Sequence, residues 1–273
     1  MTATARRPTA LTKAIFVCAF GLGLIVSAFG ASGRRPAPAE APAGAPAEFT
    51  TFTDTELMRG FMALAFGSDM RLGRKSAGIR KFDRSISLAI AAGSGPRADR
   101  YRSVIEELSS KVAGLNAKVI ADAERADVLV WLIDEKDFVP AMTSAFGQKV
   151  ASAFVRKTDP QCMTQTRSEP DGKIDHANIF VIVDQGEDVF LNCAYHETLH
   201  AFGLLNHADA NPWTALNQNR SVGYLTVYDR LLLTILYDPA VKHGVTKAEI
   251  KRVLPGIVRK INAADRPVNS GSK

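Results

Sequence analysis

The chain has 273 residues, of which 46% are hydrophobic and 23% charged, and its formal net charge is +6. The first 48 residues hold five Lys or Arg and two Glu, so the rest of the chain has a net charge of only +3. A nucleic-acid-binding domain requires basic residues clustered on one face, and this small excess argues against nucleic acid as a partner.

The N-terminal segment is typical of a secretory signal peptide. Three basic residues and no acidic residue precede position 14, and residues 14–31 are uncharged and mostly apolar. We therefore expect residues 1–31 to be a signal peptide and the protein to be exported, either to the periplasm or out of the cell. The apolar run is just long enough to cross a bilayer, so residues 14–31 could instead remain as an uncleaved tether to the inner membrane.

A single folded domain is expected after this segment. Residues 32–48 are rich in Pro and Ala and predict an extended linker. Composition changes at Phe49, and residues 49–265 are enough for one domain with a sizeable core. Residues 266–273 are expected to form a disordered tail.

Hydrophobic periodicity predicts alternating strands and helices in this domain. Helices are expected at residues 53–65, 96–115, 138–146, 188–203, 225–237 and 246–263, and strands at 86–91, 118–120, 127–133 and 179–183. The strand at 127–133 is apolar throughout and should therefore be central, whereas the arginine-rich piece at 71–84 should lie on a solvated face. The order predicts an α/β (α+β) fold, a small mixed sheet packed with helices, with a right-handed crossover between the first two strands.

Two cysteines lie within the domain, Cys162 and Cys193. In an exported protein such a pair most simply forms a disulfide, which here would join the segment before the last strand to the following helix. Free thiols, a redox pair and soft metal ligands are the alternatives.

The most informative motif is H-E-x-x-H at His196, Glu197 and His200. On a helix, residues four apart lie about 40° apart around the axis, so both imidazoles share one face and can bind Zn²⁺. Glu197 could then act as general base on a water, which is the chemistry of a zinc hydrolase. The simpler interpretation is a core helix whose histidines only hydrogen-bond to neighbours.

The segment 196–203 resembles the metzincin clan of zinc metallopeptidases, whose pattern is H-E-x-x-H-x-x-G-x-x-H. Asn206 occupies the position of the third histidine, and no Met follows Met163 to form the methionine turn of that clan. His207 comes one residue later, and the turn at Gly203 could absorb this offset, so His207 is our first choice of third ligand. The resemblance implies a zincin-like domain in which an edge strand pairs with an extended peptide substrate.

Other residues remain candidates near this site. Asp229, on the helix at 225–237, could be a third zinc ligand, could orient a ligand histidine, or could form a surface pair with Arg230. Asn206 and Asp209 are weaker candidate ligands. Tyr224 and Tyr228 are possible oxyanion donors, although tyrosines with a structural role are more common; Trp213 could wall the cleft or anchor the core.

The chain also resembles an uncharacterised family of exported bacterial domains, over roughly residues 49–257. The resemblance lies in the G-L-x-N-H segment at 203–207 and in the segment at 225–239. It implies that metal chemistry is optional across that group, because positions equivalent to His196 and His200 need not be histidine.

Together these features predict an exported zinc metallopeptidase that acts on a peptide or protein substrate. His196, His200 and His207 would bind the metal, and Glu197 would activate water. The alternative is a non-catalytic exported envelope or binding domain with a zincin-like fold and a structural or vestigial zinc site.

Overall fold

A computed structural model of the chain describes residues 52–66, 78–91, 95–155 and 161–265. The expected signal peptide, linker and C-terminal tail lie outside these residues. The described residues all belong to one compact unit of the chain.

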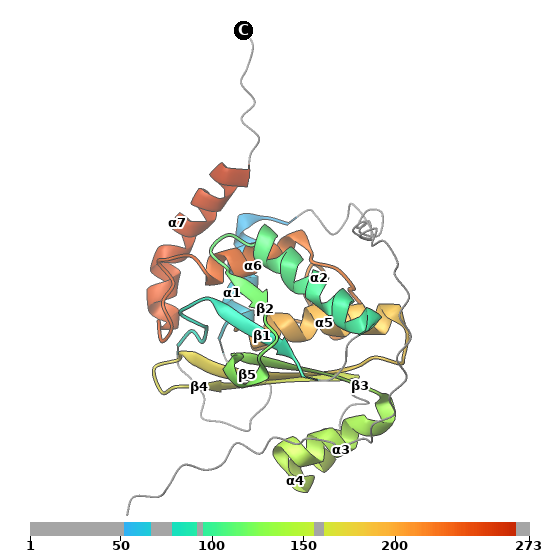
Figure 1. Ribbon diagram of the computed structural model, residues 1–273. Coiled ribbons are helices and arrows are strands. Elements are labelled where there is room, and N and C mark those ends of the chain that lie inside the picture. Colours follow the sequence, from blue (N-terminus) through green and yellow to red (C-terminus); the bar gives the residue numbers. More distant parts are fainter. Residues whose placement is uncertain (1–51, 67–77, 92–94, 156–160, 266–273) are drawn as a thin grey trace, which may run out of the picture. The chain divides into compact units, whose positions relative to one another are not determined.

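The described residues form both helices and strands, as expected for an α/β fold (Figure 1). The strands are β1 (Ile86–Ile90), β2 (Ala117–Val119), β3 (Val128–Ile133), β4 (Cys162–Ser168) and β5 (Ile174–Ile182). The helices are α1 (Asp54–Leu64), α2 (Pro96–Lys111), α3 (Glu135–Phe146), α4 (Gln148–Val155), α5 (Glu187–Ala201), α6 (Val227–Leu236) and α7 (Lys247–Asp265). In the described part of the chain, two helices, two strands and three helices follow β3 in that order.

The strands form a mixed five-stranded sheet in the order β2-β1-β3-β5-β4. Strands β2, β1, β3 and β5 are parallel, and β4 is antiparallel to β5. The predicted fold class is therefore confirmed, and β3 lies at the centre of the sheet as expected. Because β1 and β2 are parallel neighbours, the chain crosses over between them, and α2 forms that connection.

The two faces of the sheet bury different clusters of side chains. Along β3 burial alternates, with Val128, Val130 and Leu132 buried in the main core. This core also contains residues of α2, α5 and α6, which lie on one side of the sheet (Figure 1). A smaller cluster on the other face includes Phe138 and Met142 of α3, which covers that face together with α4. One face of the apolar run at 127–133 is therefore buried, and the other is only partly buried.

The fold differs from the sequence predictions at several places. Helix α4 was not predicted, and β5 begins at Ile174, five residues before the strand predicted at 179–183. Strand β4 was not predicted, because Met163 is the only buried apolar residue among the six that follow Cys162 in this strand. Lys81 was expected on a solvated face, but its side chain is only 7% exposed. Its ammonium donates to the carbonyls of Leu236 (2.6 Å), the last residue of α6, and of Val241 (2.9 Å), in the segment that follows.

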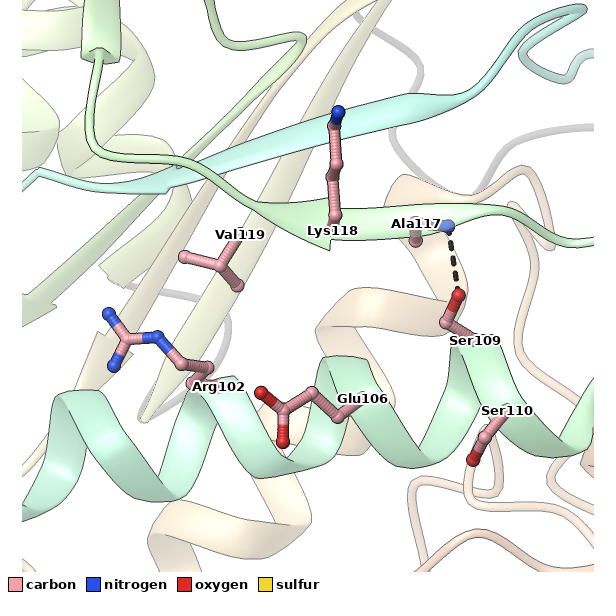
Figure 2. A pocket seen from close by; sticks show the side chains of 7 residues that line it. All are labelled: Arg102, Glu106, Ser109, Ser110, Ala117, Lys118 and Val119. Carbon is pink, nitrogen blue, oxygen red and sulfur yellow. Dashed lines mark hydrogen bonds between the residues drawn. The ribbon is translucent and has the colours of Figure 1, made fainter.

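At the edge of the sheet opposite β4, strand β2 packs on α2 beside an open hollow of about 380 Å³ (Figure 2). Its lining residues are Arg102, Glu106, Ser109, Ser110, Ala117, Lys118 and Val119. The hydroxyl of Ser109 accepts a hydrogen bond from the main chain of Ala117 at 3.1 Å, which ties the edge strand to the helix. The hollow contains none of the motif residues.

Among the described residues, no helix is both long and apolar enough to cross a membrane.

Candidate metal centre

The motif lies on α5, which follows β5 after a short connection. Helix α5 packs against β4 and β5, and its buried side chains include Phe190, Leu199 and Glu197. Because a helix brings residues i and i+4 to the same face, His196 and His200 lie next to each other, with ring centres 4.8 Å apart. The predicted helix therefore places both imidazoles as the motif requires.

A glycine follows the C-terminal end of helix α5, at a position where a side chain would be strained. Gly203 has φ = +115°, and a Cβ atom there would lie 2.3 Å from the carbonyl oxygen of Arg80. The N–H of Leu204 donates to the carbonyl of Leu199 at 3.1 Å, the hydrogen bond that closes a helix with such a left-handed glycine. The chain consequently reverses direction immediately after the second histidine.

Asn206 then fixes the returning chain to the end of α1. Its amide donates to the carbonyls of Ala63 (2.9 Å) and Phe66 (2.5 Å), and its own N–H donates to Leu64 at 3.2 Å. These carbonyls belong to the last turn of α1 and the residues after it, where helical partners are lacking. Asn206 is therefore turned away from the motif, and His207 comes next to it.

The three histidines meet at their Nε2 atoms. The distances are 2.9 Å between His196 and His207, 3.1 Å between His196 and His200, and 3.1 Å between His200 and His207. These three residues could hold a metal ion. Two nitrogen ligands bound to one ion at 2.0–2.1 Å are about 2.8–3.4 Å apart for bond angles between roughly 90° and 109°, and all three observed distances lie in this range.

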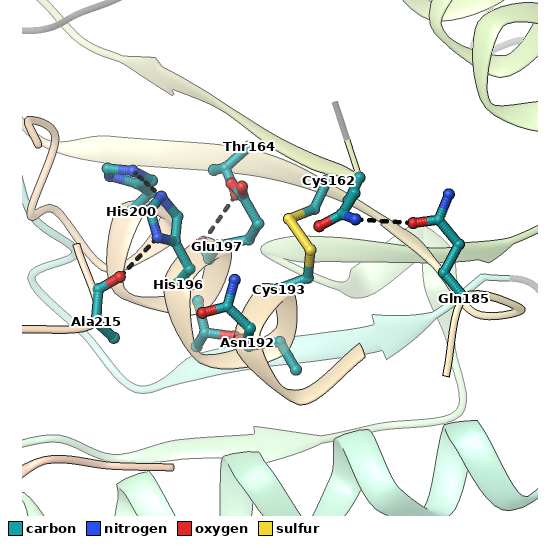
Figure 3. The surroundings of a disulfide bond; sticks show 12 residues. Cys162, Thr164, Gln185, Asn192, Cys193, His196, Glu197, His200 and Ala215 are labelled. Carbon is teal, nitrogen blue, oxygen red and sulfur yellow. Dashed lines mark hydrogen bonds between the residues drawn. A yellow bond between two sulfur atoms is a disulfide. The ribbon is translucent and has the colours of Figure 1, made fainter. Parts of the chain in front are cut away.

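Main-chain carbonyls hold two of the rings by their other nitrogen. His196 Nδ1 lies 2.8 Å from the oxygen of Ala215 (Figure 3), and His200 Nδ1 lies 2.5 Å from the oxygen of Leu204. A carbonyl can only accept, so each Nδ1 carries the proton, and the Nε2 atom of the neutral ring is left with a lone pair. Lone pairs about 3 Å apart repel one another, and a cation between them removes this repulsion.

Burial also keeps these rings neutral. Burial, followed by the charge of His207, lowers the pKa of His196 to about 4. Burial lowers the pKa of His200 well below its ordinary value, and the charges of His196 and His207 act in the same direction. Both imidazoles are therefore in the form that binds metals at neutral pH.

Glu197 follows His196 on α5 and is only 5% exposed. Burial raises the pKa of its carboxyl to about 8, and the hydroxyl of Thr164 partly offsets this effect. The hydroxyl of Thr164 donates to the main-chain oxygen of Glu197 at 2.9 Å, so β4 is joined to α5 at the motif itself (Figure 3).

A disulfide makes a second connection between β4 and α5. Cys162 and Cys193 are bonded, with Cα atoms 5.8 Å apart, which confirms the predicted pairing (Figure 3). Cys193 is three residues before His196, so the bond holds the edge strand against the turn of α5 that precedes the motif. Disulfides persist in oxidising compartments, and this bond is consistent with export.

The remaining candidates lie outside the cluster. Asp229 is 0% exposed, so the surface-pair interpretation is wrong; its oxygens accept hydrogen bonds from residues 214, 215 and 226. Asp209 accepts from the N–H of Gln218. Tyr228 is buried and donates to the main chain of Glu56, a structural role. Trp213 packs on the Tyr228 ring at 5.7 Å, in agreement with a core anchor.

Gln218 was not recognised from the sequence. Its amide nitrogen lies 3.3 Å from Nε2 of His207, so it is a further polar group beside the three ligand nitrogens. Nothing in the sequence singles out one amide in a polar loop that follows the motif by many residues. Gln218 reaches His207 only because the folded loop returns to the histidines.

A comparison with protein families matches residues 54–256 to a family described as "Protein of unknown function (DUF2927)". The chain belongs to the DUF2927 family. The DUF2927 match extends from α1 into α7 and includes every residue of the histidine cluster. It agrees with the resemblance to an uncharacterised family and does not bear on the metzincin resemblance. A comparison with curated proteins gave no match.

Proposed function

We propose that this protein is an exported zinc-dependent hydrolase, and specifically a metallopeptidase. The observation that carries the proposal is the convergence of three Nε2 atoms within 3.1 Å of one another, with the glutamate of the motif directly after the first of the three histidines on α5. Neutral imidazoles suit several transition metals, and zinc is proposed because it combines these ligands with hydrolytic chemistry.

In this proposal the histidines bind the metal and the glutamate transfers the proton. His196, His200 and His207 would hold the ion, which when bound would polarise a carbonyl and make water more acidic. Glu197 comes one residue after the first ligand, and burial raises the pKa of its carboxyl to about 8, so the charge of a bound ion would have to lower this pKa and ionise the group. The ionised carboxylate would accept the proton of the attacking water and return it to the leaving amine. Its buried position keeps competing bulk water away from the carboxyl group.

A peptide substrate is proposed because of the strand next to the motif. Strand β4 ends the sheet, and the disulfide and Thr164 hold it against α5. An extended peptide can add to such an edge through main-chain hydrogen bonds. A peptide bound there would run along the helix that carries Glu197.

Export is proposed from two features, the signal-like N-terminal sequence and the disulfide. The protein would act in the periplasm or outside the cell, and residues 14–31 would tether it to the inner membrane if they remain uncleaved.

The function is tested by Glu197→Gln, with the metal measured separately from turnover. Elemental analysis of the purified protein should give one zinc per chain in both wild type and variant, and peptide hydrolysis should fall by at least about a thousandfold. Glu187→Gln provides a matched control, because Glu187 lies at the exposed start of the same helix. Undiminished hydrolysis by Glu197→Gln would contradict the mechanism.

The second candidate is a non-catalytic exported domain with a structural metal. The contact of Gln218 with His207 favours this alternative, because amide oxygen and nitrogen are interchangeable by a flip and the oxygen could be a fourth ligand. X-ray absorption spectroscopy of the zinc form distinguishes the two. A fourth protein ligand that disappears in Gln218→Ala supports the structural site, and a water ligand supports the hydrolase.

A further inference from the structure

A buried carboxylate lies behind the histidine cluster, in the first turn of α6. Asp229 is 0% exposed, and its oxygens accept hydrogen bonds from three donors. The hydroxyl of Thr214 donates to Oδ1 at 2.5 Å, while the N–H of Ala215 and the hydroxyl of Thr226 each donate to Oδ2 at 2.8 Å. Burying a carboxylate is costly, and these donors offset that cost.

Two of the donors are not needed to begin the helix. The hydroxyl of Thr226 already caps α6, since it accepts from the N–H of Asp229 at 2.9 Å. Thr214 and Ala215 belong to a different segment of chain. The carboxylate of Asp229 therefore fixes this loop to α6 in addition to stabilising the start of the helix.

The loop in turn holds a histidine of the cluster. The N–H of Ala215 donates to Asp229, and the carbonyl of Ala215 accepts from Nδ1 of His196 at 2.8 Å. One residue thus joins the buried carboxylate on one side to the imidazole on the other. Without Asp229 the loop would keep the hydrogen bond from the N–H of Ala208 to the carbonyl of Leu216 (3.1 Å) but would lose its attachment to α6 at Ala215 itself.

We propose that Asp229 is a positioning residue of the metal centre, acting through Ala215 to hold the His196 ring with Nε2 directed at His200 and His207. The inference rests on the metal site of the proposed function but not on catalysis. Partners that orient a ligand histidine typically change metal affinity tenfold to a hundredfold when they are removed.

Three substitutions at and near this position separate the roles. Asp229→Ala removes all the acceptors. Asp229→Asn keeps the shape: its oxygen can accept from Ala215 and Thr226, and its NH₂ can donate to the Thr214 hydroxyl. Tyr228→Phe is the matched control, because Tyr228 precedes Asp229 on α6 and is equally buried. It loses the hydrogen bonds of its hydroxyl to Glu56 of α1 and to Asn211 of the loop, but leaves the bond between Asp229 and Ala215 in place.

Zn²⁺ affinity is measured by competition with a chromophoric chelator, at a temperature where circular dichroism shows each protein to be fully folded. We expect Asp229→Ala to bind zinc roughly ten to a hundred times more weakly, and Asp229→Asn and Tyr228→Phe to stay within about threefold of wild type. A folded Asp229→Ala protein with wild-type affinity would overturn the proposal. If Asp229→Ala does not fold, Thr214→Val, which removes one donor, should weaken zinc binding by at least about threefold, and an unchanged affinity would have the same meaning.

A second measurement does not require metal. The Nδ1–H proton of His196, protected by the Ala215 carbonyl, should give a resolved signal in long-range ¹H–¹⁵N spectra of the metal-free protein. It should persist in Asp229→Asn and Tyr228→Phe and be lost in Asp229→Ala; its persistence there would overturn the proposal. If wild type binds no zinc, the proposed function fails, while this signal still tests the role of Asp229.

Discussion

The Nε2 atoms of His196 and His207 lie 2.9 Å apart, although one residue is on α5 and the other is eleven residues later, in an irregular segment. The main-chain reversal at Gly203 and the attachment of Asn206 to the end of α1 together produce this contact. The helix supplies two ligands by its periodicity, whereas the third depends on the packing of α1 against the returning chain.

The first prediction separates the ligand from the residue that positions the segment. His207→Ala should lower zinc affinity by about a hundredfold or more, because a ligand is lost. Asn206→Ala should lower the free energy of unfolding by about 1–3 kcal/mol, because the carbonyls of Ala63 and Phe66 lose their donor. Chelator competition and urea denaturation of the metal-free proteins measure the two effects.

The opposite ranking would reverse the assignment. If Asn206→Ala abolished zinc binding in a folded protein while His207→Ala retained it, Asn206 would be the ligand, as the spacing of the metzincin pattern alone would suggest.

The sequence was sufficient to predict the parts of the site that depend on local periodicity. His196 and His200 share a helix face because of the 3.6-residue repeat, and β3 was recognised from its run of apolar residues. Strand β4 was not predicted, because an edge strand buries few side chains and a single buried Met163 among polar residues gives a weak hydrophobic pattern.

The remaining parts depend on contacts between distant segments. An aspartate in an apolar helix is compatible with a surface, a ligand or a buried role, and only the approach of the 214–215 segment shows which applies to Asp229. Lys81 is similar, because its burial depends on carbonyls at the end of α6 and in the segment after it, more than 150 residues later. Neither contact has a signature in the local sequence.

The disulfide should contribute substantially to stability. Replacing both cysteines, by Cys162→Ser and Cys193→Ser, opens a loop with a sequence separation of 31 residues, for which chain entropy predicts a loss of about 3–4 kcal/mol. Thermal and urea denaturation of the double variant measure this loss. Because the bond holds β4 against α5, the zinc affinity of the folded variant should also decrease. An unchanged affinity would show that Thr164 alone is enough to keep the strand in place.

The pH dependence of the metal-free protein should show the burial of His196. The unfolded chain takes up this proton near pH 6.5, but the pKa in the folded protein is lowered to about 4, so the unfolded state binds more protons between these values. The contribution of His196 to the free energy of unfolding is therefore fully present above pH 6.5 and is lost as pH falls toward 4, by roughly 3 kcal/mol at most.

Glu197 acts in the opposite direction, because its pKa is raised to about 8. The prediction therefore concerns the difference in unfolding free energy between wild type and His196→Gln, in which the effect of Glu197 is common to both. In urea denaturation of chelator-treated proteins between pH 4.5 and 7, the unfolding free energy of wild type should decrease relative to that of His196→Gln as pH falls. A difference independent of pH would mean that the His196 ring is solvated.

The last prediction concerns the turn that brings His207 to the cluster. Gly203→Ala should cost about 2 kcal/mol or more, because φ = +115° is strained for alanine and the new Cβ would meet the Arg80 carbonyl at 2.3 Å. Gly147→Ala is the matched control: Gly147 also follows a helix with positive φ, but a Cβ there has no neighbour within 4 Å. Only Gly203→Ala should also weaken zinc binding, since relieving its clash moves the segment that carries His207. Equal zinc affinities in two folded variants would show that the turn tolerates this displacement and that His207 is held in place by Asn206 alone.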